Sequence, residues 1–279
     1  MVVILMDMLS AIKMLPARAF QTQGDPDKVS ERYQSIDTSQ YLTVMYDNGF
    51  ELENVVCPKA KKEGNDLFKK HIMVFQHSKP YEIELNDKVK PRILITNSHD
   101  GTTAFRLQTG LLRLVCENGL VLMTNQNAMR IKHKGFDADL LNEKVIEMVQ
   151  GFDGVYRQIG EMQNTLVSKE QRERIAIRGA KIALNGNLYA ENVDEVDFED
   201  YIDINSILRA AYQIDRANMN TVYGTYNIVE RNLRLGHYFN AFNSKELDGR
   251  AVYQQAKPLS EMRAIEFGGQ FHNLVTEYL

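Results

Sequence analysis

The chain has no tryptophan and only two cysteines among its 279 residues, and each shortage narrows what it can be. Cys57 and Cys116 lack the spacing of a zinc site, and each lies in a run of strand-forming residues, where a buried free thiol is the common state. This cysteine usage indicates a reducing compartment, so we expect a cytoplasmic protein. The lack of tryptophan removes one common platform on which nucleic-acid bases stack.

Several catalytic motifs are also missing. The sequence contains neither the glycine-rich nucleotide motifs GxxxxGK[ST] and GxGxxG, nor the GxSxG elbow of hydrolases, nor the HExxH pair of zinc proteases. His99 and Asp100 resemble a general base with its orienting acid, but the glycine that follows them favours a turn. We expect no catalytic residues, no metal and no cofactor; whether the protein is an enzyme stays open, with a non-enzymatic role favoured.

The chain begins with the apolar segment MVVILMDMLSAIKML. It has no basic leading region and is interrupted by Asp7 and Lys13, which is not typical of a signal peptide, and it is too short to cross a bilayer. We expect residues 1–30 to form an N-terminal helix or arm that docks on the body or on a neighbouring subunit, with no membrane partner.

The segment 92–124 contains two runs of strand-forming residues, each broken by a tight-turn dipeptide, Asp100-Gly101 and Asn118-Gly119. Type I′ hairpin turns need positive φ at both central residues, which these residue types tolerate. The segment therefore predicts two β-hairpins. Eight strands are expected in all, at 50–57, 69–76, 81–85, 92–96, 104–108, 111–116, 120–123 and 129–132.

Helical patterns flank and follow the strands. Thr38 and Gly49 read as the N-cap and C-terminal glycine of a short helix. From Leu141 to Leu166 apolar residues recur every three or four positions, which predicts one long helix, bent or closely approached at its glycines. Further helices are expected at 169–184 after the cap Ser168, at 204–214, at 220–235, and at 259–279 with a break at Gly268-Gly269.

These elements predict the α+β class: an N-terminal antiparallel β-meander sheet packed by long C-terminal helices. After the N-terminal arm, we expect a β-rich half of the core at 31–135 and a helical half at 136–279. No proline- or serine-rich linker separates the halves, so we expect a single α+β unit.

Charge is segregated along the chain. Residues 59–134 carry fourteen Lys and Arg against seven Asp and Glu, whereas residues 187–203 carry seven acids and no base. Strand alternation places Arg130, Lys132 and Lys134 on one face of a strand. Candidate phosphate contacts are Lys61, Lys62, Lys69, Lys70, Arg130, Lys132 and Lys134. Candidate partner-binding acids are Asp194, Glu195, Asp197, Glu199 and Asp200. Two ordinary solvated faces would account for the same segregation.

Six segments resemble a known family. They are VSERYQSIDT with GFELENV, FKKHIMVF, NSHDGTTAFRLQTGLLRLVCENGLVL, IKHKG and TYNIVERNLRLG, and they follow the family's order from about residue 29. The chain resembles the phage- and plasmid-borne family called domain of unknown function 932. The resemblance implies a mobile-element protein in a bacterial host cytoplasm and supplies no enzyme activity. The tail, residues 249–267, departs from similar proteins, which are more basic there and end in a tryptophan-containing helix.

Three functions fit these observations. The first is a DNA-binding protein of a phage or mobile element, non-enzymatic, that binds or anneals single-stranded DNA on a basic sheet and forms a homo-oligomer, a role that would belong to recombination. The second is an anti-defence inhibitor that binds a host defence protein through its acidic segment. The third is a metal-dependent nuclease.

Overall fold

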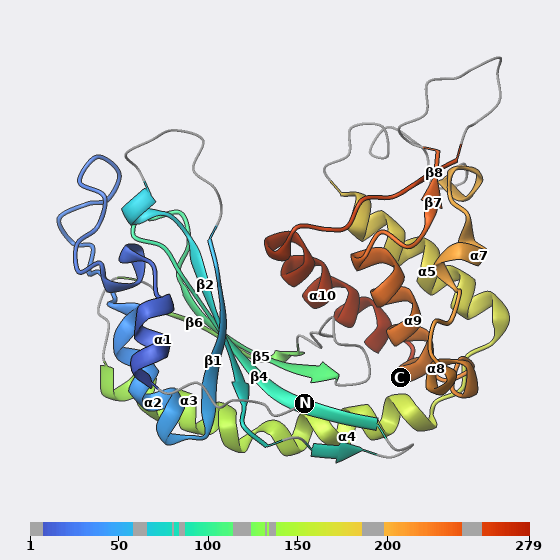
Figure 1. Cartoon of the computed structure of the whole chain (residues 1–279), viewed down its shortest axis with the longest axis horizontal. Coiled ribbons are helices and arrows are strands. Elements are labelled where there is room, and N and C mark those ends of the chain that lie inside the picture. The colour runs from blue at the N-terminus through green and yellow to red at the C-terminus, as the bar shows by residue number, and fades with distance from the viewer. Residues whose placement is uncertain are drawn as a thin grey trace. The chain divides into compact units, whose positions relative to one another are not determined.

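The computed structural model describes most of the chain, in two compact units (Figure 1). The units are Met1–Val155 and Tyr156–Leu279, and the boundary between them lies inside a helix. The residues described are 8–57, 66–79, 81–83, 87–113, 124–131, 133, 138–185, 198–241 and 253–279. The predicted division at residue 135 marks instead where strands give way to helices, and the prediction of a single α+β unit stays a prediction.

Unit 1 consists of an antiparallel sheet and several helices. Its strands are β1 (Phe50–Val56), β2 (His71–His77), β3 (Tyr81–Ile83), β4 (Asp87–Asn97), β5 (Phe105–Arg113) and β6 (Thr124–Ile131). Its helices are α1 (Met8–Met14), η1 (Ala17–Phe20), η2 (Thr38–Gln40), α2 (Tyr41–Asp47), η3 (Asp66–Phe68), α3 (Ala138–Gln150) and the start of α4 (Phe152–Asn164).

Within the described strands the sheet order is β1-β2-β4-β5-β6, with β3 paired to β4. Each pairing is antiparallel, and the strand connections follow the chain, which confirms the predicted α+β class with its antiparallel meander. One strand, β5, replaces the two expected at 104–108 and 111–116. Gly110 lies inside this strand and pairs with Arg92, so it does not break the strand.

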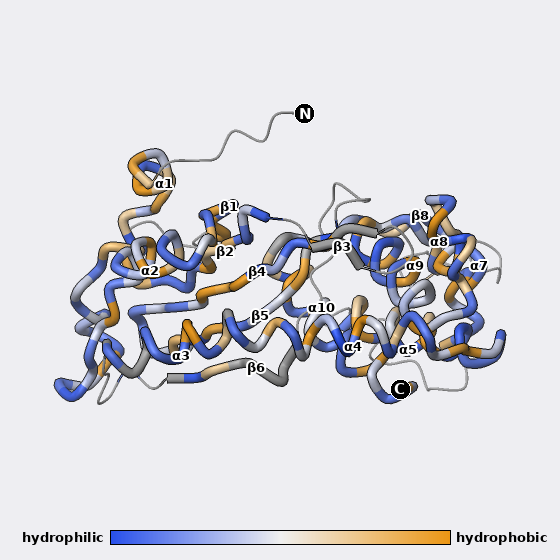
Figure 2. The backbone as a smooth tube through the Cα atoms, turned by 90° about the horizontal axis from the view of Figure 1, so that it is seen from below, coloured by the Kyte–Doolittle hydropathy of each residue, from blue (hydrophilic) through white to orange (hydrophobic). Residues whose placement is uncertain are grey.

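One face of the sheet is covered by helices, and we call it the helix face. The Tyr41 ring of α2 lies 5.2 Å from Phe105 of β5, and the Phe152 ring of α4 lies 6.0 Å from Phe50 of β1. All four side chains are buried, and the apolar centre of β4 is orange in Figure 2. The opposite face, which we call the second face, carries the alternate residues of each strand.

The connection between β4 and β5 is longer than the predicted two-residue hairpin turn. β4 ends at Asn97 and β5 begins at Phe105, so residues 98–104 form the loop between them. Gly101 does adopt a positive φ of 73°, as the turn prediction requires. β5 also pairs antiparallel with β6, through residues 105–109 and 124–131. The predicted strand 120–123 and its Asn118-Gly119 turn lie outside the described residues, so the second hairpin stays a prediction.

The expected long helix 141–166 divides at Gly151 into α3 and α4. The predicted seam is buried from Val145 to Met162, with Met148 and Val155 at most 5% exposed, but α4 ends at Asn164 and Leu166 is 75% exposed, so the last predicted position of the seam is wrong. A Cβ atom at Gly154 or Gly160 would meet nothing within 4 Å, so neither glycine serves a close backbone approach.

Local cap signals are correct at most helix ends. Gly49 and Gly236 end helices with φ of 79° and 67°, and Ser168 forms a capping box with Gln171. Thr38 does not cap the helix as predicted. The Asp37 side chain accepts the Ser39 amide hydrogen at this helix start, whereas the Thr38 side chain is buried in a polar network described below.

Unit 2 is mainly helical, and α5, α9 and α10 pack on one another. Its elements are the rest of α4, then α5 (Lys169–Leu184), η5 (Phe198–Tyr201), α7 (Ile204–Ile207), α8 (Gln213–Ala217), α9 (Val222–Arg234), β7 (Phe239–Asn240), β8 (Gln254–Gln255) and α10 (Glu261–Thr276). The helix expected at 204–214 is two short helices, and α10 runs through Gly268-Gly269 without the expected break. No helix among the described residues is long and apolar enough to cross a membrane.

Candidate nucleic-acid interface

Two arginines face each other across neighbouring strands on the second face of the sheet. The register places Arg106 of β5 directly opposite Arg130 of β6, and both side chains are exposed. Neither guanidinium has an ion-pair partner among the described residues. Like charges directly opposite each other in a sheet are destabilising, so this pair favours an anion on the second face.

A third arginine on the same face has a different role. Arg92 of β4 is four residues from Thr96, the partner of Arg106, so alternation puts Arg92 on the second face. It is 7% exposed and forms an ion pair with Glu53. Glu53 lies at the irregularity where the β1–β2 register shifts between Leu52 and Asn54, and such bulges re-aim side chains. Arg92 is therefore committed within the protein.

A cleft of about 580 Å³ adjoins Arg130, and we call it the loop cleft. It is lined by Lys28, Val29, Ser30, Arg32, Tyr33, Gly101, Thr102, Thr103, Ala104, Arg130 and His133. Three of these side chains are cationic and none is acidic. Lys28 Nζ lies 2.5 Å from Asp25 Oδ2, whereas Arg32 is exposed and has no ion-pair partner among the residues described. The cleft therefore carries an excess of positive charge.

Behind the loop cleft lies a buried set of polar side chains, which we call the loop network: Thr38, His71, Asn97, Ser98, His99 and Asp100. Asn97 Nδ2 donates to the Ile36 carbonyl and to Thr38 Oγ1, each at 2.9 Å, and its Oδ1 accepts from the Ser98 amide at 2.9 Å. Because these bonds tie the end of β4 and the start of the loop 98–104 to the segment before α2, they hold one wall of the cleft in place.

His99 is part of this network and is not a free base. Its Nε2 lies 3.0 Å from the Arg18 carbonyl, which can only accept, so Nε2 carries the proton and Nδ1 accepts from Ser35 Oγ at 2.7 Å. Burial lowers the pKa of His99 to about 4, which keeps the ring neutral. The side chain is fully buried.

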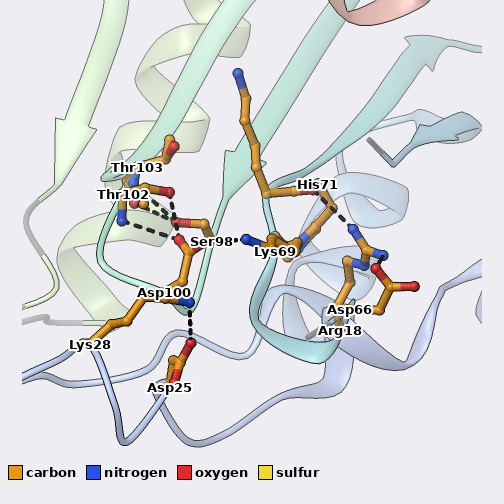
Figure 3. A network of polar contacts seen from close by, with 11 residues as sticks. Arg18, Asp25, Lys28, Asp66, Lys69, His71, Ser98, Asp100, Thr102 and Thr103 are labelled. Carbon is orange, nitrogen blue, oxygen red and sulfur yellow. Dashed lines mark hydrogen bonds and ion pairs between the residues drawn. The ribbon is translucent and has the colours of Figure 1, made fainter. Parts of the chain in front are cut away.

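Asp100 does not orient His99. Its Oδ1 accepts from the Thr102 amide at 3.2 Å and from Thr102 Oγ1 at 2.5 Å, and Lys69 Nζ lies 3.8 Å from Oδ2 (Figure 3). Hydrogen bonds from Thr102 and the Lys69 charge outweigh burial and lower the pKa of Asp100. The carboxylate thus shapes the turn at Gly101.

The structure brings together only part of the predicted cation set. Arg130 is exposed on β6, Lys69 faces Asp100, and the Lys70 carbonyl accepts a hydrogen bond from Arg18 Nη1 at 3.2 Å. The remaining predicted cations, Lys61, Lys62, Lys132 and Lys134, lie outside the described residues.

Three cations near Arg130 were missed by sequence reasoning: Arg106, Arg32 and Lys28. Arg32 and Lys28 belong to a segment far from the sheet in sequence, and Arg106 requires the β5–β6 register. The only sequence signal for Arg32 and Lys28 was their position, with Arg32 near the start of the VSERYQSIDT segment and Lys28 just before it.

Part of the predicted acidic partner site can be located. Glu199 and Asp200 are exposed in η5 of unit 2, where the Tyr253 hydroxyl donates a hydrogen bond to the Asp200 carbonyl. Asp194, Glu195 and Asp197 lie outside the described residues.

Comparison with known proteins gives a family and two named relatives. A family model described as "Domain of unknown function (DUF932)" matches residues 27–257. The chain is similar to UPF0380 protein YafZ of Escherichia coli K12, with 30% identity over 147 residues that cover 53% of this chain and 52% of the relative. It is also similar to UPF0380 protein YfjQ of the same strain, with 28% identity over 147 residues and the same coverage. The match thus spans about half the length of these relatives. No solved structure matches the chain.

Proposed function

The chain belongs to the family described as Domain of unknown function (DUF932), a name that assigns no activity, and from the geometry of its sheet we propose that it binds single-stranded DNA. Arg106 and Arg130 contact successive phosphates on the second face of the sheet. The protein acts without catalysis, in the cytoplasm of a bacterium that carries a phage or other mobile element.

The exposed arginine pair is the observation that supports this proposal. Residues directly opposite in an antiparallel pair have Cβ atoms about 5 Å apart, so two guanidinium groups here present a concentrated positive charge. A phosphate backbone would neutralise both. Such contacts release counterions and make binding strongly dependent on salt.

A single strand suits the sheet better than a duplex. Strand binding in proteins combines a basic surface with aromatic side chains that stack on unpaired bases. Tyr33 and His133 line the loop cleft beside Arg130, and their rings stack at 4.6 Å. A strand leaving Arg130 would contact the edges of this aromatic pair, because the Tyr33 ring already stacks on His133.

The test is a titration of a fluorescein-labelled thirty-nucleotide deoxythymidine strand at two salt concentrations. We expect the double variant R106Q/R130Q to bind about tenfold more weakly, since each lost phosphate contact removes a charge-assisted bond. We also expect its salt slope to fall by about 1.4, because each phosphate contact contributes about 0.7 on single strands.

A matched control has the same change in net charge. R157Q/R174Q replaces two exposed arginines of unit 2, one in α4 and one in α5. Because only the net charge of the protein changes, strand affinity should stay within about twofold of the wild type. Absence of binding at low salt, or equal losses in the two double variants, would refute the proposal. Deoxyribonucleotide and ribonucleotide strands of the same length would show whether the protein binds DNA or RNA more tightly.

Annealing and self-assembly are part of the same proposal. We expect the protein to form a homo-oligomer, and a mass in solution that grows on addition of single strands would support annealing. A DNA-indifferent mass together with no strand binding would favour the protein-binding alternative through the acidic segment.

A further inference from the structure

The loop cleft has the size of a small-molecule site and lies at one end of the arginine pair. Its volume of about 580 Å³ falls within the range of ligand pockets. It is bounded by a segment that precedes α2, by the β4–β5 loop and by the end of β6, all within unit 1. Arg130 belongs to both the sheet pair and the cleft lining.

The charge of the cleft selects an anion. Arg32 and Arg130 are exposed, and neither has an ion-pair partner among the residues that the structure describes. Two buried carboxylates near the cleft are already engaged: Asp25 holds Lys28 at 2.5 Å, and Asp100 holds Thr102 and Lys69. Two guanidinium groups thus remain available for a phosphate, which they bind in a bidentate manner.

The aromatic wall of the cleft favours an organic ligand that is larger than an inorganic ion. The Tyr33 ring stacks on His133 at 4.6 Å with an interplanar angle of 24°. Its hydroxyl donates to the Ser98 carbonyl at 2.9 Å, and a Cβ atom on Gly24 would lie only 2.7 Å from Tyr33 Cδ1. The aromatic wall is therefore held between Gly24 and His133 and anchored to the loop network. An aromatic edge beside two arginines offers apolar contact to the sugar and base of a nucleotide whose phosphate the arginines bind.

We propose that the loop cleft binds one nucleoside monophosphate, presented as the phosphorylated end of the strand that crosses Arg106 and Arg130. Arg32 and Arg130 hold the terminal phosphate, and the edges of Tyr33 and His133 contact the base and sugar. The strand-end part of this proposal rests on the proposed function, whereas binding of a free nucleotide does not.

The experiment uses the full chain and four probes measured by calorimetric titration: deoxyadenosine 5′-monophosphate, deoxyadenosine, inorganic phosphate, and a ten-nucleotide strand with or without a terminal phosphate at either end. We expect the monophosphate to bind more tightly than either deoxyadenosine or phosphate alone. We also expect one phosphorylated end to raise strand affinity about tenfold, the value of a charge-assisted contact.

Two variants separate the cleft from the sheet. Arg32→Gln should weaken the monophosphate about tenfold and remove the advantage of the phosphorylated end, while Arg32→Lys restores part of both. Arg106→Gln lies outside the cleft lining and should leave monophosphate binding unchanged while it weakens the longer strand. Both residues are exposed, so folding should be unaffected.

The outcomes distinguish the two proposals. Strand binding with no monophosphate binding and no end effect would overturn the cleft proposal and leave the proposed function intact. Monophosphate binding that depends on Arg32, with no strand binding, would support the nucleotide site and overturn both strand binding and the strand-end role. Equal affinity for inorganic phosphate and the monophosphate would show a simple anion site and overturn the nucleotide assignment.

Discussion

Two regions rich in buried polar side chains differ in how far their polar atoms are paired. In the loop network of unit 1, Asn97, His99 and Asp100 each make two or more hydrogen bonds. In unit 2, one face of α9 with His272 of α10 forms what we call the α9 cluster: Tyr226, Asn227, Glu230, Arg234 and His272. Each of these five has a buried atom with no hydrogen-bond partner among the described residues.

The difference separates groups that stabilise the fold from groups that cost stability. A buried polar group that keeps its bonds adds modest stability, whereas an unpaired one retains its full desolvation penalty. Burial raises the pKa of Glu230 despite the nearby Arg234, whose Nε lies 2.7 Å from Glu230 Oε1. Loss of a fully bonded polar group from the loop network should therefore cost far more than loss of a poorly bonded neutral group from the α9 cluster.

The largest expected difference in stability is between alanine substitutions of one asparagine from each region. Asn97→Ala removes three hydrogen bonds and leaves their partners buried, so we expect a loss of about 4 kcal/mol in the free energy of unfolding. Asn227 donates only to the Tyr223 carbonyl, four residues earlier, and its Oδ1 is unpaired among the described residues. Asn227→Ala should change stability by less than about 0.5 kcal/mol, since alanine also favours a helix. Urea unfolding compares the two, and equal losses would break the comparison.

The next effect tests whether the ion pair in the α9 cluster stabilises the fold. Glu230→Met leaves the Arg234 charge buried without its partner and should cost about 3 kcal/mol. The double variant E230M/R234M removes both charges and should lie within about 1 kcal/mol of the wild type. A double variant as unstable as the sum of the single variants would show that the pair is a net stabiliser.

The pH dependence of stability should be shared by both regions, because burial lowers the pKa of His99 and of His272 to about 4. The unfolded chain binds protons near pH 6.5 that the folded rings do not, so stability is full above that pH and is lost as pH falls toward 4. Each ring should contribute a loss of about 2 kcal/mol at pH 5.

Replacement of His99 and of His272 by phenylalanine should affect stability differently in the two regions. His272→Phe keeps contact with Tyr226, removes an unpaired Nδ1, and should flatten the pH profile with little loss at pH 7. His99→Phe removes the hydrogen bonds to Ser35 Oγ and to the Arg18 carbonyl, leaving each with one contact to Gln21, and should lower stability at pH 7. Denaturant midpoints measured from pH 4 to 8 decide this, and a harmless His99→Phe would contradict the structural role of the loop network.

The smallest expected effect concerns the exposed surface. Arg106→Gln removes repulsion from Arg130 and should raise stability by about 0.5 kcal/mol at low salt. Arg130→Gln should give the same gain, and the double variant should gain no more, because one substitution already ends the repulsion. Thermal unfolding at low and high salt measures this, and a loss of stability would mean that the pair is compensated within the protein.

Local structure was largely readable from sequence. Gly49 and Gly236 end helices because only glycine adopts their positive φ readily, and Ser168 caps α5 through contacts three residues away. The strands of the sheet followed from runs of strand-forming residues. Misreadings occurred where tertiary packing overrode a local signal, as at Gly110 within β5 and at Gly268-Gly269 within α10.

The candidate site was only partly readable. Alternation along one strand placed Arg130 on a surface, but its partner Arg106 depends on the register between β5 and β6. Arg32 reaches the cleft because Asn97 and Tyr33 bind groups more than sixty residues away along the chain.

The sequence by itself determined the helices, the strands and the antiparallel sheet of this protein, because turns, caps and alternation act over a few neighbouring residues. Only the tertiary structure decided which cations share a surface, which histidines are neutral and where the loop cleft lies. Those properties depend on strand register and on hydrogen bonds between distant segments, and no short stretch of sequence contains either.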